Sequence, residues 1–329
     1  MKVLITGGLG YLGGRIAQHL GGLLPKSNIR LLIRNGGQPV PAWAEGYDVL
    51  SGNILDDAAL SRACTGIDSI VHLAALNEID SERRPLDALK VNGEGTLRLL
   101  NAATESGVGR FIYFSTFHVY GLNAFGEITE NTVPAPFHPY AITHHVAEDF
   151  VRMATQKRKT RGVILRLSNG VGYPSHPTVN RWSLAFNNFC LQAVLRSEIV
   201  LKSSGRQHRD FITLTDISRC VEHILLGDGK IFEDRNIIYN LGGDYSISIL
   251  DAAKLVAERC QKTLGKRSKI IVGRSSEEAK GKDMDEPVVY RCDRIKSTGF
   301  QLISNIIEEI DKTIAFCEEN KEYLECNMK

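Results

Sequence analysis

Tyr140 and His144 stand four residues apart in the stretch HPYAITHHVAEDF (138–150), which is predicted to be helical. Side chains at i and i+4 share one helix face, so the phenol and the imidazole are predicted to meet, whereas His145 is rotated away. A phenol has a pKa near ~10, so a base that works at pH 7 needs this pKa lowered by about 3 units. An imidazole has a reference pKa of about 6.5, and His144 is therefore expected to be mostly neutral near pH 7.

Two predicted strands lead toward this pair. The stretch DSIVHLAAL (68–76) is typical of a strand that is buried in a parallel sheet. The stretch RFIYFSTFHVYG (110–121) predicts a second strand, which leads into Ser115 and Thr116 and a turn at Gly121. The helix that carries Tyr140 and His144 follows this second strand.

The N-terminus predicts a dinucleotide-binding unit. The strand candidate KVLIT ends in glycines, with Gly7, Gly10 and Gly13 in the spacing G-x-x-G-x-x-G, and an amphipathic helix and a second strand, NIRLLIR (28–34), follow. Glycine is needed where a turn takes positive φ, where backbone approaches a pyrophosphate, and where the helix packs closely on its strand. The N-terminus of the helix would then face the negative charge.

The end of the second strand bears on which nicotinamide cofactor binds. An acidic residue there accepts hydrogen bonds from the adenosine ribose, whereas an arginine favours a 2′-phosphate. The strand ends in Arg34, and no carboxylate follows until Glu45, so NADP(H) is favoured and NAD(H) is the alternative. A third strand is predicted to end at Asn53, which would meet the adenine edge, and a helix capped near Asp56 follows.

The composition excludes several classes of protein. The 329 residues are 43% hydrophobic, with 40 Lys and Arg against 38 Asp and Glu, which indicates a large core and no bulk attraction to nucleic acid or an anionic membrane. No apolar run is long enough to span a bilayer, and glycines interrupt the N-terminal apolar stretch, which argues against a signal peptide. Seven scattered cysteines without C-x-x-C spacing predict free thiols in a cytoplasmic protein and no metal site.

A series of motifs in order along the chain resembles one family, the extended short-chain dehydrogenase/reductases, in its nucleotide-sugar epimerase/dehydratase branch. TGGLGYLG matches the glycine motif, HLAAL the H-x-A-A segment, VNGEGT the N-x-x-G-T segment, and STFHVYG the Ser/Thr motif. YAITH takes the place of Y-x-x-x-K, so His144 stands where the family has lysine. Further matches are LRLSNGVGYP (165–174), RDFITLTD (209–216), YNLGG (239–243) and YRCDRIKSTGF (290–300).

The resemblance implies an α/β fold with a Rossmann-type doubly wound parallel sheet and a smaller C-terminal substrate domain. The expected dinucleotide-binding domain comprises residues 1–167 and 211–240, and the substrate domain comprises residues 168–210 and 241–329. The resemblance also implies a homodimer formed by the helices around 85–105 and 140–156.

The resemblance assigns roles to individual residues. Tyr140 would be the acid/base, Thr116 its hydroxyl partner, and His144 a hydrogen-bonding replacement for the lysine that holds the nicotinamide ribose, discouraged from protonation by the positive ring. The expected cofactor residues are Gly7, Gly10, Tyr11, Leu12, Gly13, Arg34, Asn53, Ile54, Leu73, Ala74, Ala75, Asn92, Ser115, Tyr140 and His144. The expected substrate residues are Thr116, His118, Asn169 and Arg209, the last two at the nucleotide diphosphate.

The function implied is a nicotinamide-dependent epimerase or oxidoreductase that acts on a nucleotide sugar, with hydride transfer at C4 favoured. Dehydratases of the family carry Asp-Glu after the threonine, whereas this chain carries Phe117 and His118, so dehydration is disfavoured. Two alternatives stay open: an NADP-dependent reductase of a small carbonyl compound, and a cofactor-sensing binding protein whose catalysis has lapsed. The sequence leaves open the base and the sugar of the substrate and the direction of hydride flow.

Overall fold

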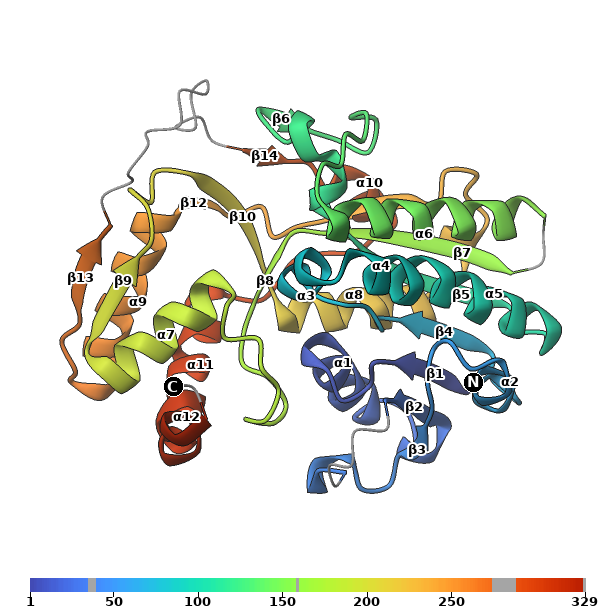
Figure 1. The fold of residues 1–329 in the computed structure, drawn as a ribbon, viewed down its shortest axis with the longest axis horizontal. Helices are drawn as coiled ribbons and strands as arrows, with labels where there is room; N and C mark the ends of the chain where they lie inside the picture. Colours follow the sequence, from blue (N-terminus) through green and yellow to red (C-terminus); the bar gives the residue numbers. More distant parts are fainter. Residues whose placement is uncertain (35–39, 158–159, 274–287, 328–329) are drawn as a thin grey trace.

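A seven-stranded, wholly parallel sheet forms the centre of the computed structural model, which describes residues 1–34, 40–157, 160–273 and 288–327. Its strand order is β11–β7–β5–β4–β1–β2–β3, with the order reversing beside β1 (Figure 1). The strands are β1 (Val3–Thr6), β2 (Ile29–Ile33), β3 (Asp48–Ser51), β4 (Ser69–His72), β5 (Arg110–Thr116), β7 (Arg161–Leu167) and β11 (Ile238–Leu241). This arrangement confirms the predicted doubly wound fold.

Helices cover both faces of this sheet, which explains why its central strands are buried almost throughout and rich in apolar residues. Two helices pack together on one face, α1 (Tyr11–Gly21) and α8 (Leu214–Leu226). Three helices pack side by side on the other face: α2 (Asp57–Cys64), α5 (Gly95–Glu105) and α6 (Pro139–Gln156). Between β4 and α5 the chain forms α3 (Glu78–Arg83), α4 (Pro85–Ala88) and a π-helical segment, η3 (Leu89–Glu94).

A smaller α/β part lies beside the carboxyl ends of the sheet strands (Figure 1). Its strands are β8 (Asn169–Val171), β9 (Glu198–Leu201), β10 (His208–Thr213), β12 (Ser246–Ser248) and β13 (Lys269–Val272). Its helices are α7 (Ala185–Arg196), α9 (Ile249–Leu264), α11 (Ile306–Glu319) and α12 (Lys321–Asn327), around a core of their own. The remaining elements are β6 (Glu127–Ile128), β14 (Val289–Tyr290), α10 (Asp293–Ser297), η1 (Lys26–Asn28), η2 (Ala42–Ala44), η4 (Phe117–Asn123) and η5 (Lys230–Phe232).

Helix α1 joins the two parts of the molecule. The hydroxyl of Tyr11 donates to the carbonyl oxygen of Gly172 at 2.9 Å. One turn later, Arg15 forms an ion pair with Glu309 at 2.9 Å, in which both side chains are largely buried. The helix that begins at the glycine motif is therefore anchored to the smaller part along one side. No helix in the described part of the chain combines the length and apolarity that crossing a bilayer requires.

Several predicted elements end earlier than the sequence indicated. The third strand ends at Ser51 rather than Asn53, because the side chain of Asn53 accepts from the Leu55 N–H and forms a local turn. The fourth strand ends at His72, because the N–H groups of Leu73 and Ala74 both donate to Thr6 Oγ1 and leave the ladder. Strand termination by local side-chain or turn bonds is not visible in an apolar pattern.

Candidate active site

The glycine motif forms a tight loop between β1 and α1. Gly7 has φ +67°, a conformation that favours glycine, and its N–H donates to the Leu32 carbonyl at 3.0 Å. A Cβ on Gly13 would lie 2.2 Å from the carbonyl oxygen of Gly7, a distance that no side chain tolerates. The third glycine is therefore required for the first turn of α1 to pack against the loop.

The N-terminus of α1 is free to receive an anion. Its capping residue, Gly10, offers no side-chain hydrogen bond, and no acidic residue stands in the first turn. The first N–H groups of a helix need partners and carry partial positive charge. Backbone of Leu73 and Ala74 closes the other side of the loop, 3.4 Å from where a Gly7 Cβ would stand. These features fit the pyrophosphate of a dinucleotide.

The edge expected to meet the adenosine is formed by the ends of β2 and β3. Arg34 follows the last residue of β2 and is exposed, and residues 35–39 lie outside the described part of the chain. The amide oxygen of Asn53 is used by the Leu55 N–H at 3.0 Å. Ile54 is buried against the start of α5, where a Cβ on Gly95 would meet its side chain.

Tyr140, the predicted acid/base, lies at the start of α6 beside Thr116 and His144. The phenol of Tyr140 interacts with the buried hydroxyl of Thr116, and its ring centroid lies 4.5 Å from that of His144. Withdrawal from water raises the pKa of Tyr140 well above its ordinary value, and the nearby charge of Glu78 raises it further. The Thr116 hydrogen bond and the Arg181 guanidinium act in the opposite direction on this pKa.

His144 is buried, with 3% of its surface exposed. Its Nδ1 lies 2.7 Å from the hydroxyl of Tyr113 in β5, and its Nε2 has no hydrogen-bond partner among the described residues. Burial lowers the pKa of His144 to about 4. The imidazole is therefore neutral near pH 7, as the sequence predicted, although burial in the apoprotein is sufficient cause without a positive nicotinamide ring.

Sequence reasoning missed two charged residues beside the tyrosine. Glu78, in α3, forms an ion pair of 3.2 Å with Arg181, in the loop that precedes α7. Loss of hydration lowers the pKa of His118 to about 4, and the charge of Glu78 opposes that shift. The pair joins segments 103 positions apart, and neither residue stands in a recognisable local motif, so only the tertiary structure brings them to Tyr140.

Arg209 and Asn169 lie on the paired strands β10 and β8. The Nδ2 of Asn169 donates to the Asp210 carbonyl at 2.9 Å, and the guanidinium of Arg209 donates to the His208 carbonyl at 3.1 Å. Within residues 1–34, 40–157, 160–273 and 288–327, no carboxylate stands within ion-pair distance of Arg209, and burial lowers its pKa. A partly desolvated cation without a counterion suits an anionic ligand.

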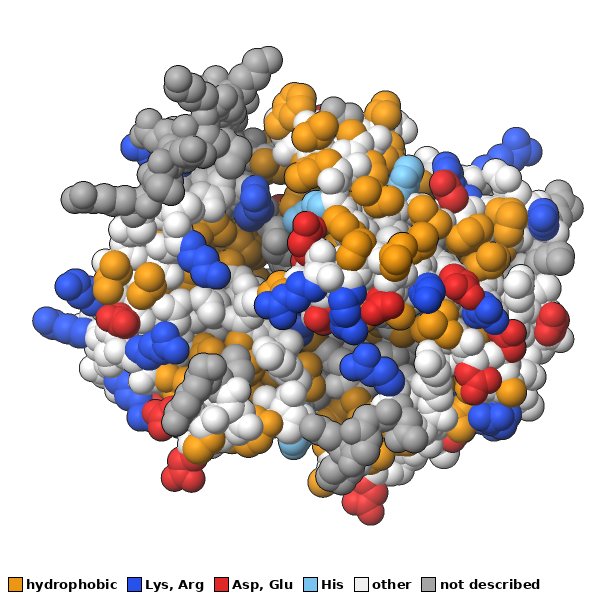
Figure 2. Space-filling view, viewed as in Figure 1, with side chains coloured by type: hydrophobic (Ala, Val, Ile, Leu, Met, Phe, Trp, Pro, Cys, Tyr) orange, Lys and Arg blue, Asp and Glu red, His pale blue; other side chains and the backbone are white. Residues whose placement is uncertain are grey.

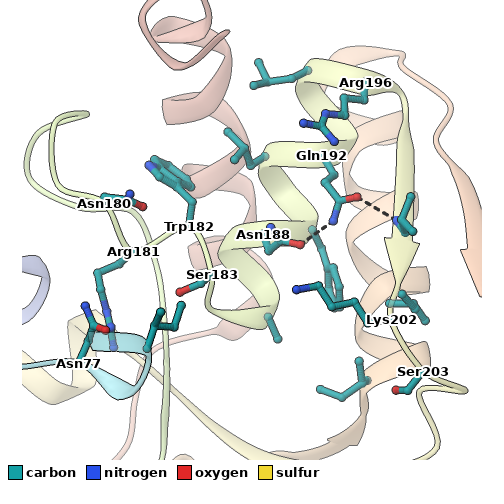
Figure 3. Close-up of a pocket in the computed structure, with 18 of the residues that line it drawn as sticks. Asn77, Asn180, Arg181, Trp182, Ser183, Asn188, Gln192, Arg196, Lys202 and Ser203 are labelled. Atoms are coloured by element: carbon teal, nitrogen blue, oxygen red, sulfur yellow. Dashed lines mark hydrogen bonds between the residues drawn. The ribbon is translucent and has the colours of Figure 1, made fainter. Parts of the chain in front are cut away.

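A pocket of about 900 Å³ lies between α3 and the α7–β9 segment (Figure 3). Asn77 and Arg181 line one side, and α7 and β9 line the other. The amide of Gln192 donates to Asn188 Oδ1 at 2.5 Å and accepts from the Val200 N–H at 2.9 Å, which fixes the far wall. Arg181 lines this pocket, and its charge also acts on Tyr140, whose pKa it lowers. Figure 2 shows charged side chains around the hollow between the two parts of the molecule.

Three side chains that were expected to contact the cofactor form hydrogen bonds within the protein. Both ends of the Asn92 amide are used, by the Leu76 N–H at 2.8 Å and by Thr143 at 3.0 Å. Ser115 donates to the buried carboxylate of Glu148 at 2.6 Å, and the hydroxyl of Tyr11 faces the smaller part of the molecule. These bonds use part of the hydrogen-bonding capacity of the three side chains within the protein itself.

Comparisons with known proteins identify the family of this chain. The model of the NAD dependent epimerase/dehydratase family matches residues 3–242. The dTDP-D-glucose 4,6-dehydratase of Mus musculus is 30% identical over 275 residues, covering 80% of this chain and 74% of the relative. An uncharacterized UDP-glucose epimerase of Bacillus subtilis, YtcB, is 27% identical over 273 residues, covering 78% of this chain and 82% of the relative.

Solved structures show the same fold. The epimerase Mth375 of Methanothermobacter thermautotrophicus has a TM-score of 0.81 and 23% identity, covering 99% of this chain and 94% of the other. The UDP-glucuronic acid 4-epimerase of Bacillus cereus, solved with NAD, has a TM-score of 0.78 and 22% identity, covering 97% of both chains. With the family match over residues 3–242 and the glycine loop and tyrosine helix in place, this chain belongs to the NAD-dependent epimerase/dehydratase family of nucleotide-sugar enzymes.

Proposed function

We propose that this enzyme transfers hydride between a nicotinamide cofactor and a carbon of a nucleoside-diphosphate sugar, with C4 as the favoured position. The observation that carries the proposal is the interaction of the Tyr140 phenol with the buried Thr116 hydroxyl, with the ring of the buried His144 4.5 Å from that of Tyr140 between centroids. A phenol in this position can take the proton of a sugar hydroxyl as hydride leaves the same carbon. Thr116 would hold the sugar oxygen beside it.

The residues that would hold the cofactor begin at the glycine loop. The N–H groups at the start of α1 would bind its pyrophosphate, and the Nε2 of His144 would hydrogen-bond its nicotinamide ribose. When bound, the cofactor supplies a hydride acceptor or donor. Arg34, exposed after β2, supports a preference for the 2′-phosphate of NADP(H) over NAD(H).

Arg209 would bind the diphosphate of the substrate. Its guanidinium is partly desolvated and lacks a carboxylate partner among the described residues, so an incoming diphosphate would supply the missing charge. Asn169 lies on the neighbouring strand and would support the same group. An uncharged carbonyl substrate would have no use for this cation, which favours a nucleotide sugar.

Dehydration is disfavoured in this proposal, although the mouse relative is named a dehydratase. Elimination needs an acid and a base beside the sugar in addition to the tyrosine. The two positions after Thr116 hold Phe117 and His118, and the carboxylate of Glu78 is engaged by Arg181 at 3.2 Å.

We also propose a homodimer in the cytoplasm. Large apolar side chains are exposed on α4, η3 and α6, among them Leu86 (74% exposed), Leu89 (47%) and Ile142 (43%), and Figure 2 shows apolar groups over this face. Six of the seven free cysteines are buried, which suits a reducing compartment. Sedimentation of the purified protein and of the Leu86→Asp variant would test the dimer, which is expected to dissociate in the variant.

The test of the function is a panel of UDP-, GDP- and dTDP-sugars with purified protein and each cofactor. Nicotinamide absorbance in a single turnover reports hydride transfer, and product analysis separates epimers from 4-keto-6-deoxy products. The proposal expects turnover of one sugar without water loss, and none in Tyr140→Phe with cofactor still bound. Turnover in Tyr140→Phe, or a 4-keto-6-deoxy product, would refute it. Binding of cofactor alone would indicate a protein whose catalysis has lapsed.

A further inference from the structure

Tyr113 has no role in the proposed function, yet its hydroxyl has a defined partner in the site. It lies in β5 with 3% of its surface exposed, and its oxygen is 2.7 Å from Nδ1 of His144. No other hydrogen bond of this hydroxyl occurs among the described residues. The opposite nitrogen, Nε2 of His144, is buried with no partner in the same set of residues. Buried polar atoms without a protein partner are uncommon in folded proteins, and a bound cofactor could supply the partner of this nitrogen.

We infer that Tyr113 is a positioning residue that donates its proton to Nδ1 of His144 and so holds the neutral imidazole as the Nε2–H tautomer. This inference rests on the proposed function, because it assumes that the site binds a nicotinamide cofactor. It gives His144 an N–H donor at the position where the motif that this chain resembles carries lysine, which is also a donor.

Hydrogen-bond inventory decides the direction of the Tyr113 bond. A neutral imidazole has one donor nitrogen and one acceptor nitrogen, and a phenol has one proton to donate. If Nδ1–H donated to Tyr113, the phenol proton would be buried without an acceptor. Burial raises the pKa of Tyr113 well above its ordinary value, so the phenol keeps that proton. Donation from Tyr113 instead leaves Nε2–H as the donor without a protein partner, and a bound cofactor could accept from this group.

The tautomer matters for catalysis because of what lies beside the ring. The centroid of Tyr140 is 4.5 Å from that of His144. An Nε2–H group can donate to a ribose hydroxyl, which can then donate to the phenolate of Tyr140. An unprotonated Nε2 would instead accept the hydrogen bond of the ribose hydroxyl, and the phenolate of Tyr140 would lose that donor. Tyr113 therefore acts through His144, and its contribution depends on histidine at that position.

The first test reads the tautomer directly. ¹⁵N-histidine labelling distinguishes a protonated from an unprotonated ring nitrogen, and the His144 signal is the one that disappears in His144→Gln. The cofactor-free protein at neutral pH is expected to show Nε2–H at residue 144, and Tyr113→Phe is expected to introduce the Nδ1–H form. An Nδ1–H tautomer in the unaltered protein overturns the inference. No sugar is present, so this result is independent of whether the nucleotide-sugar proposal holds.

The second test measures cofactor affinity by fluorescence, with whichever of NAD⁺ and NADP⁺ binds more tightly. Tyr113→Phe is expected to weaken binding roughly three- to tenfold, the effect of one lost hydrogen bond. Tyr239→Phe removes another buried hydroxyl of the same sheet, bonded to Asp234, and is expected to leave affinity unchanged. In a His144→Lys background, Tyr113→Phe is expected to have less than a twofold effect, because lysine carries its own donors. An equal loss in both backgrounds would mean that Tyr113 only fills space.

Discussion

Glu78 and Arg181 form an ion pair of 3.2 Å whose charges both act on Tyr140, and the two residues come from α3 and from the loop before α7. Their charges act on the tyrosine in opposite directions: the carboxylate raises its pKa and the guanidinium lowers it. Neither residue was identified from the sequence. The pair therefore offers a way to change the acidity of Tyr140 without touching the tyrosine.

Removing the Glu78 charge is expected to make Tyr140 more acidic. In Glu78→Gln the nearby negative charge is lost and Arg181 is left unpaired, so the tyrosine-linked inflection of the pH–rate profile should move down by about one pH unit. Arg181→Gln should move the same inflection upward. The exposed pair of Glu127 and Arg291 provides the control, since Glu127→Gln should leave the profile unchanged. Shifts of the same sign in both site variants would contradict the assignment.

Replacing His144 with lysine restores the residue that the related motif carries. The neutral imidazole gives Tyr140 little electrostatic help, whereas an ammonium favours the phenolate, so the oxidative inflection should move to lower pH. His145→Lys adds the same charge on a different face of α6 and is expected to shift the inflection less. An inflection that stays in place in His144→Lys would show that residue 144 does not set the acidity of Tyr140.

Arg209 is expected to contribute to substrate binding and not to cofactor binding. Arg209→Ala should weaken nucleotide-sugar affinity about ten- to a hundredfold, the worth of a charged hydrogen bond, and leave dinucleotide affinity nearly unchanged. Arg209→Lys keeps the charge but not the planar guanidinium, so its nucleotide-sugar affinity should lie between those of the unaltered protein and Arg209→Ala. Calorimetric titration with each ligand measures both affinities. Equal losses for sugar nucleotide and dinucleotide would make the arginine structural.

Arg34 is expected to discriminate between the two cofactors. NADP(H) should bind more tightly than NAD(H), and Arg34→Asp should reverse the order by removing the cation and offering a carboxylate to the ribose hydroxyls. Fluorescence titration with both dinucleotides measures the ratio. Arg62→Asp, on the exposed side of α2, makes the same charge change away from this edge and should preserve the order. Equal affinities in the unaltered protein would remove the basis for an NADP preference.

Buried neutral histidines should make the fold sensitive to mild acid. Burial lowers the pKa of His144 and of His118 to about 4, and that of His72 to about 3. Below a reference value of about 6.5, the unfolded chain binds protons that the folded chain does not, so the free energy of unfolding falls as pH drops from 6.5 toward 4. Each such histidine contributes a slope of up to ~1.4 kcal/mol per pH unit.

Urea unfolding at a series of pH values tests this sensitivity. His144→Gln removes one of the three titrating groups, so its free energy of unfolding should decline less steeply between pH 6.5 and 4 than that of the unaltered protein. His145→Gln, on the neighbouring and half-buried position, is the matched control. A slope that is the same in His144→Gln and in the unaltered protein would mean that His144 is protonated in the fold.

The amino-acid sequence by itself determined the parallel sheet, the cofactor loop and the tyrosine helix. Each depends on short-range chemistry: glycine spacing at Gly7, Gly10 and Gly13, apolar strands, and the i, i+4 relation of Tyr140 and His144. The neutrality of His144 also followed from its residue type, although the sequence could not show that it would be buried. Local patterns were less informative on where β3 and β4 end, because side-chain turns there compete with strand pairing.

Only the tertiary structure decided what surrounds the pair. Glu78 and Arg181 reach Tyr140 because the chain folds α3 and the loop before α7 against each other, and Tyr113 reaches His144 because α6 packs on β5. The pKa of a buried group depends on its distance from charges and from water, which sequence separation does not encode. Tertiary contacts also give Asn92 and Ser115 hydrogen-bond partners within the protein, in addition to the cofactor role that their motifs predicted.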